Sequence, residues 1–134
     1  MKIDGEFTLT SWDEETVVER EGGRKLTRAD VTQELGGAVR GKGAVVWLMN
    51  YADDGTAHFV GMQHFDGTIG DRTGTVVLET TGDFDGGEAT WDATVVEGSG
   101  TGDWSDMRGK GIFRAPHGSK ATFSLDCSFD GSSN

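Results

Sequence analysis

The sequence predicts an all-β fold, a small closed antiparallel barrel of about eight strands, with a β-sandwich as the alternative. Apolar and polar residues alternate over short runs, as they do in strands buried on one face. Turn signals separate these runs, and the chain holds 22 glycines but only one proline. Short connections in meander order favour closure, because closure removes exposed sheet edges.

Eight runs carry the strand pattern. Asp54-Gly55, between the third and fourth runs, is typical of a two-residue hairpin. The acidic stretch 13–23 is expected to be the longest loop, with room for one helical turn. The eight runs are 6–12, 26–35, 38–51, 57–65, 75–84, 88–96, 109–114 and 120–129.

A chain of 134 residues fits one domain with one core. We place this domain at residues 1–129 and expect 130–134 to be a disordered tail. Residues 44–49 of the third run include no polar side chain, which predicts a strand buried on both faces. In a small barrel the outer face of such a strand needs a cover, and a homodimer partner is the simplest one.

The net charge of −11 argues against nucleic acid and anionic membranes as partners, because both would be repelled. Cys127 is the only cysteine, so an internal disulfide is excluded, and its apolar neighbours indicate a buried structural thiol. Residues 1–7 lack the pattern of a signal peptide, and no apolar stretch is long enough to span a membrane. We therefore expect a cytoplasmic protein.

No metal or other cofactor is expected. His58 and His64 are six residues apart on one predicted strand, which separates them by about 20 Å, too far to share an ion. The glycine-rich stretch 36–43 lacks the Ser or Thr and the following helix of a phosphate-binding loop. No nucleophile elbow of the G-x-S-x-G type occurs.

An apolar pocket is one interpretation of the inward residues. Trp47, Met49 and Tyr51 share a face of the third run, and core packing is the simpler explanation for them. A cavity between such side chains would suit a flat, apolar small molecule. Trp12 and Trp104 border polar segments and are expected to cap the barrel ends or cover its mouth. The candidate ligand-binding residues are Trp47, Met49, His58, Met62, Trp91 and Phe123.

The run 57–65 can face either way. One face carries His58, Met62 and His64, and the other carries Phe59 and Phe65. If the first face lines the interior, its imidazoles suit acid–base chemistry near neutral pH. An outward position, or one at a dimer contact, is the simpler interpretation for each histidine alone.

His64, with Tyr51 or Glu79, is the candidate for proton transfer. The alternation of 75–84 places Glu79 outside, but Val77 shares its face, so this assignment stays open.

Several segments carry a family resemblance. They are 7–12 (FTLTSW), 25–28 (KLTR), 55–61 (GTAHFVG), 67–74 (GTIGDRTG) and 98–111 (GSGTGDWSDMRGKG). Through them the chain resembles the bacterial domain of unknown function 3224 family, assigned to the allene oxide cyclase-like barrels. The resemblance implies an eight-stranded, often self-associating barrel and no established activity.

Similar barrels include plant allene oxide cyclases, dirigent proteins and bacterial cyclases of natural-product pathways. These enzymes work without cofactors, since the cavity positions the substrate and excludes water. No motif here transfers their catalytic residues.

Three hypotheses follow from the sequence and the resemblance. The first is a cofactor-free cyclase or isomerase acting on an apolar small molecule inside the barrel. The second is a non-catalytic, lipocalin-like binding barrel. The third is a structural or interaction protein with a filled interior. A cavity with an inward ionisable group favours the first, a purely apolar cavity the second, and a solid interior the third.

Overall fold

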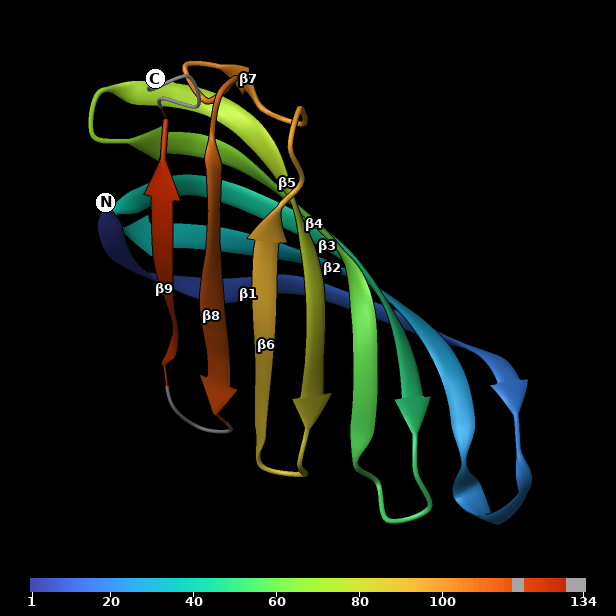
Figure 1. The fold of residues 1–134 in the computed structure, drawn as a ribbon. Helices are drawn as coiled ribbons and strands as arrows, with labels where there is room; N and C mark the ends of the chain where they lie inside the picture. The colour runs from blue at the N-terminus through green and yellow to red at the C-terminus, as the bar shows by residue number, and fades with distance from the viewer. Residues whose placement is uncertain (117–119, 130–134) are drawn as a thin grey trace.

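A computed structural model describes residues 1–116 and 120–129 of the chain. It confirms an all-β, closed antiparallel barrel of eight strands, with one short extra strand, β7, paired to β5. The closed order is β1-β2-β3-β4-β5-β6-β8-β9, and β9 pairs with β1 (Figure 1). The predicted tail 130–134 lies outside the described residues. The strands are β1 (Lys2–Glu19), β2 (Lys25–Gly37), β3 (Val39–Tyr51), β4 (Ala57–Ile69), β5 (Arg72–Phe84), β6 (Glu88–Val95), β7 (Thr101–Gly102), β8 (Arg108–Pro116) and β9 (Ala121–Ser128).

Alternation of side chains produces the barrel wall. Along β2, for example, Thr27, Ala29, Val31 and Gln33 are buried, while Arg28 and Thr32 between them are exposed. Successive side chains of a strand point to opposite faces, so each strand gives one row to the interior and one to the surface. The predicted meander is therefore realised, with β6 joined to β8 through the segment that contains β7.

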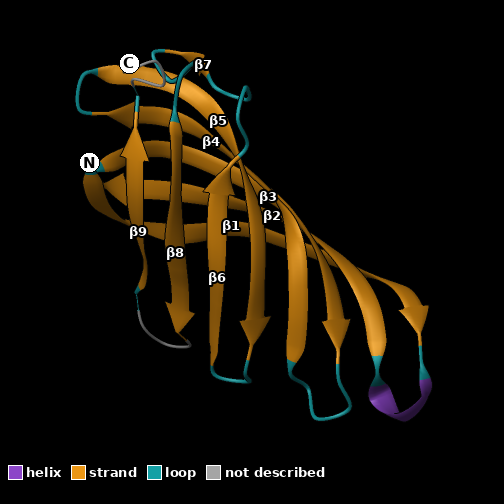
Figure 2. Ribbon diagram, in the orientation of Figure 1, coloured by secondary structure: helices purple, strands orange, loops and turns teal. Residues whose placement is uncertain are grey.

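Two predicted connections differ from those in the structure. The stretch 13–23 is mostly strand, because β1 continues to Glu19 and pairs with β2 as far as Lys25. Its acidic side chains except Glu14 are exposed, so this strand lacks the apolar alternation that marks the others. The helical turn is confined to η1 (Glu21–Gly23), at the tip of the hairpin (Figure 2). The turn around Asp54-Gly55 spans 52–56, since the amide of Ala52 donates to the carbonyl of Thr56 at 2.8 Å.

The outer face of β3 and β4 is exposed in the single chain, so burial of β3 on both faces depends on the predicted dimer partner. Val46 and Leu48 are 39% and 56% exposed, although Val45, Trp47 and Met49 between them are buried. Val60 and Met62 on β4 are 42% and 52% exposed beside them. We call these four side chains the outer apolar patch. A dimer partner that covers it stays a prediction.

The interior is packed with aromatic rings and is closed at one end. Trp91, Phe113 and Phe123 stack in sequence, with ring centroids 5.3 and 4.9 Å apart. Trp104, which follows β7, is fully buried, and its indole N–H donates to the carbonyl of Arg72 at 3.2 Å. Trp104 therefore caps the end of the barrel where β5 begins. Among the described residues, no helix is long and apolar enough to cross a membrane.

Candidate functional site

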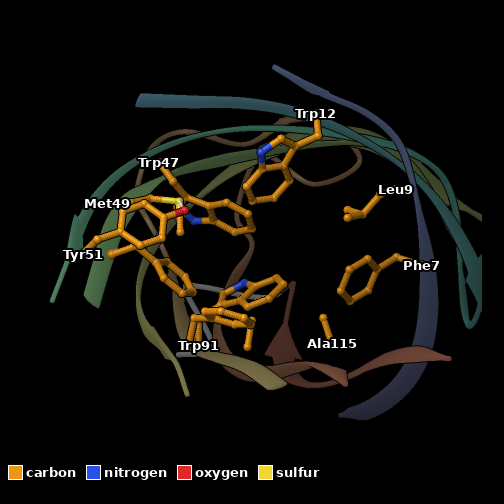
Figure 3. Close-up of a pocket in the computed structure, with 11 residues that line it drawn as sticks. Phe7, Leu9, Trp12, Trp47, Met49, Tyr51, Trp91 and Ala115 are labelled. Carbon is orange, nitrogen blue, oxygen red and sulfur yellow. Dashed lines mark hydrogen bonds between the residues drawn. The ribbon is translucent and has the colours of Figure 1, made fainter. Parts of the chain in front are cut away.

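A cavity of about 230 Å³ lies at the end of the barrel opposite Trp104. It is reached where β3 and β5 end and β6 begins, whereas Trp104 lies at the start of β5. Its lining side chains surround a central space (Figure 3). Seven of the eleven are aromatic, and Leu9 and Trp12, each 45% exposed, mark its opening to solvent. The lining residues are Phe7, Leu9, Trp12, Trp47, Met49, Tyr51, Phe59, Phe84, Ala89, Trp91 and Ala115.

A β-bulge in β1 determines which side chains this strand gives to the cavity. Leu9 pairs with Gln33 and Ser11 with Thr32, so Thr10 is an extra residue. Before the bulge the inward residues have odd numbers, as Phe7 and Leu9 do. After it the inward residues have even numbers, since Trp12 and Glu14 pair with the inward residues of β2. A bulge re-aims the side chains that follow it, and here it brings Trp12 to the cavity and Glu14 beside it.

The deep wall of the cavity has its two indole N–H groups already paired. The Trp47 indole N–H donates to the Thr80 hydroxyl at 3.1 Å, and the Trp91 indole N–H donates to the Gln63 side-chain oxygen at 3.3 Å. Gln63 in turn donates to Gln33 at 2.9 Å. Because these indole N–H groups are used inside the wall, Trp47 and Trp91 present mainly apolar ring surface to the cavity.

The polar groups beside the cavity gather around the Glu14 carboxylate. The Tyr51 hydroxyl donates to Glu14 Oε2 at 2.7 Å, and the buried Thr27 hydroxyl donates to the same oxygen at 2.6 Å. The Trp12 indole N–H donates to Glu14 Oε1 at 3.0 Å. Lys25 lies over the Tyr51 ring, with its Nζ 5.1 Å from the ring centroid. Two cavity-lining side chains, Tyr51 and Trp12, therefore hold this carboxylate between them.

The two ionisable groups shift in opposite directions. Burial raises the pKa of Tyr51 above its ordinary value of 10.0, and the bond to the Glu14 carboxylate raises it further. Burial also acts to raise the pKa of Glu14. The hydrogen bonds from Thr27, Tyr51 and Trp12 and the charge of Lys25 outweigh that effect, so the pKa of Glu14 is lowered. At neutral pH the pair is a protonated phenol bound to a carboxylate.

The structure brings together four of the predicted site residues. Trp47, Met49, Tyr51 and Trp91 all line the cavity. Phe123 lies deeper in the core, stacked on Phe113, and does not line the cavity. Its inward direction follows from the alternation of the last strand, but its depth along the barrel does not.

The histidine face of β4 points outward, which corrects the interior placement of His58, Met62 and His64. Phe59, Gln63 and Phe65 occupy the interior instead, and a strand has only one inward face. His58 forms an exposed hydrogen bond between its Nδ1 and Asp83 Oδ1 at 2.9 Å.

Glu79 is exposed opposite Met62, outside the barrel, as the alternation of its strand indicated. Neither His64 nor Glu79 can reach a ligand in the cavity from these positions.

The prediction also missed several lining residues and the carboxylate beside them. Phe59 could have been recognised, because its face of 57–65 carries the two phenylalanines. Trp12 was expected only as a cap or cover, and Glu14 not at all, because the bulge reverses the alternation between Leu9 and Trp12. Among the described residues, no group of three or more His, Cys, Asp or Glu side chains could hold a metal ion.

The fold and cavity define a class of protein, the small up-and-down β-barrel with an apolar interior cavity. Within that class, the chain belongs to the family described as "Protein of unknown function (DUF3224)", whose family model matches residues 3–127. A solved structure of a DUF3224-family protein of unknown function from Shewanella oneidensis MR-1 has a TM-score of 0.81. It covers 96% of this chain and 97% of its own at 20% identity, so the likeness concerns the fold. A search of curated proteins found no match.

Proposed function

We propose that this protein is a binding barrel for an apolar small molecule. The observation that carries the proposal is the cavity, which is walled by seven aromatic rings and open beside Trp12. Apolar clefts with a few placed polar groups are the usual form of ligand sites. A purely structural barrel would have a filled interior, and the cavity at this end of the molecule agrees less well with that role.

The cavity volume sets the size of the ligand. Its 230 Å³ is below the roughly 300–1,000 Å³ of pockets for drug-sized molecules. An apolar cavity of about 150 Å³ can hold benzene. The proposed ligand therefore has about the size of a substituted single ring. Flat apolar molecules gain most here, because they can stack on the Trp and Phe faces.

A cofactor-free cyclase or isomerase is a second candidate, favoured by one observation. The Tyr51 hydroxyl lies at the cavity wall and is bonded to Glu14, so a phenol and a carboxylate adjoin the ligand space. Their pKa shifts make this role less favourable, since a raised pKa weakens Tyr51 as an acid and a lowered pKa weakens Glu14 as a base. Recovery of the bound ligand unchanged would support the binding role.

Titration with tert-butylbenzene, followed by the indole N–H signals in NMR, tests the proposal. Three of the four tryptophans, Trp12, Trp47 and Trp91, line the cavity, and Trp104 lies at the closed end. We expect three indole signals to shift on titration and the Trp104 signal to stay in place. Uniform small shifts, or none, would contradict binding in the cavity.

A pair of identical substitutions provides the control. Ala115→Phe fills cavity space and is expected to abolish the shifts (Figure 3). Ala38→Phe adds the same ring to an exposed turn between β2 and β3, away from the cavity, and is expected to leave binding intact. Equal binding by both variants would place the ligand elsewhere.

A further inference from the structure

The Glu14 carboxylate carries a negative charge that the surrounding protein satisfies only with neutral donors. Its three side-chain hydrogen bonds come from a phenol, an alcohol and an indole. Across the described part of the chain, no cationic nitrogen comes within 4.0 Å of it. A carboxylate has about four acceptor sites, so one remains beyond these three bonds. Lys25, over the Tyr51 ring, acts on this carboxylate through space, so Glu14 is an ionised group beside the mouth with one positive group near it.

The aromatic rings at the mouth add a second attraction for positive charge. Trp12 lies at the mouth, and its ring centroid is 6.0 Å from that of Trp47 on the deep wall. Trp12 and Tyr51 both line the cavity (Figure 3), and both donate a hydrogen bond to Glu14 beside it. The faces of Trp and Tyr rings attract cations within about 6 Å, and such rings recognise quaternary ammonium groups. One side of Tyr51 already carries Lys25.

The charge of the whole molecule acts in the same direction. The net charge of −11 raises the local concentration of cations around the barrel. A substituted ammonium group is also suited to this mouth, because Trp12 is 45% exposed there and the head group can keep part of its water. A neutral ligand would gain no electrostatic attraction from the negative charge of Glu14.

We propose that the ligand is an organic cation, with an apolar body inside the cavity and an ammonium head group at the mouth, against the ring of Trp12 and beside Glu14. This inference rests on the proposed binding function and specifies its ligand class. Glu14 acts here as the selective group, whereas the deep wall accepts any apolar body of suitable size.

The test compares two probes of nearly the same shape, phenyltrimethylammonium and neutral tert-butylbenzene, by NMR titration of the purified chain. We expect the cation to bind about tenfold more tightly than its neutral counterpart. Glu14→Gln is expected to remove most of this difference, measured as the ratio of the two affinities in the same variant. Glu15→Gln removes the same charge from an exposed neighbouring position and is expected to keep the difference.

The possible failures can be told apart. If tert-butylbenzene binds at least as tightly as the cation, the cation inference is wrong and the binding function stands. If Glu15→Gln reduces the preference as much as Glu14→Gln does, the general charge of the protein is responsible, and the proposed role of Glu14 is overturned. If neither probe binds to the wild-type protein, both proposals fail. The wild-type comparison remains decisive even if the Glu14 variant does not fold.

Discussion

Tyr51 is the residue whose chemistry the cavity alters most. Burial and the adjacent Glu14 carboxylate raise its pKa. Because it is the only tyrosine, an ultraviolet absorbance titration reports on it alone among the phenols. We predict no phenolate in the folded protein near pH 10, the ordinary value, and ionisation only well above it. Glu14→Gln should lower the pKa of Tyr51 toward that ordinary value.

The same shift affects stability at high pH. The folded protein keeps the Tyr51 proton above pH 10, where the unfolded chain loses it, so the stabilisation is complete below pH 10 and decreases as the pH rises further. The Tyr51→Phe variant should therefore lose less stability than the wild-type protein as the pH rises above 10. An ordinary titration near pH 10 in the folded wild-type protein would show that the bond to Glu14 is absent.

At the residue scale, alternation predicted only part of the site. It identified Trp47, Met49, Tyr51 and Trp91, because each lies on a strand whose inward face is clear from its neighbours. It failed for His64, since both faces of 57–65 carry large apolar side chains and only packing against the other strands decides between them.

At the scale of elements, β3 and β4 lie close together beside Trp47 because β4 has a glycine, Gly61, opposite that residue. A Cβ atom on Gly61 would overlap the carbonyl oxygen of Val46 and lie 2.7 Å from Cδ1 of Trp47. Gly61→Ala therefore has to displace backbone or the Trp47 ring. We predict a loss of about 1–3 kcal/mol in the free energy of unfolding, the usual cost of overpacking, measured by urea denaturation.

Gly87→Ala is the matched control for this substitution. The nearest atom to a Cβ there is Asp85 Oδ1 at 3.8 Å, so the added methyl group has room. Its effect should stay within about 0.5 kcal/mol. Equal urea midpoints for the two variants would show that the strands around Trp47 can separate without cost.

The elements themselves were largely predictable, and the exceptions have a physical reason. The central strands follow from alternation and turn residues. The second half of β1 does not, because its inward residues Trp12, Glu14 and Thr16 are mostly polar and its exposed residues mix acidic side chains with Val17 and Val18. This segment is a strand because it pairs with β2. Pairing between residues far apart in the sequence leaves no periodic pattern within either segment.

For the whole molecule, closure was predictable from eight short runs in meander order, and the position of the cavity was not. Trp104 fills one end, whereas the other end stays open beside Trp12. Both tryptophans border polar segments in the sequence. Which of them is buried depends on how the segment after β7 folds against the start of β5, where Trp104 bonds to Arg72.

The predicted homodimer has a defined candidate surface, the outer apolar patch. Exposed Arg28 borders it on the β2 side and exposed Glu79 on the β5 side. Arg28 is itself paired with Asp30 at 3.2 Å, so the four exposed apolar side chains, rather than charge, favour a second copy. We predict a dimer in light scattering and a monomer for Leu48→Lys. Ile112→Lys, at a 55% exposed position on β8, should remain dimeric, and a monomeric wild-type protein would contradict the prediction.

The central claim is that a small apolar molecule binds inside the barrel between the tryptophans. The most direct measurement is a crystal structure after soaking with bromobenzene, with the bromine located by its anomalous scattering. The account predicts a bromine site inside the ring formed by Trp47, Trp91 and Ala115. An empty cavity, or bromine only on the outer apolar patch, would contradict it.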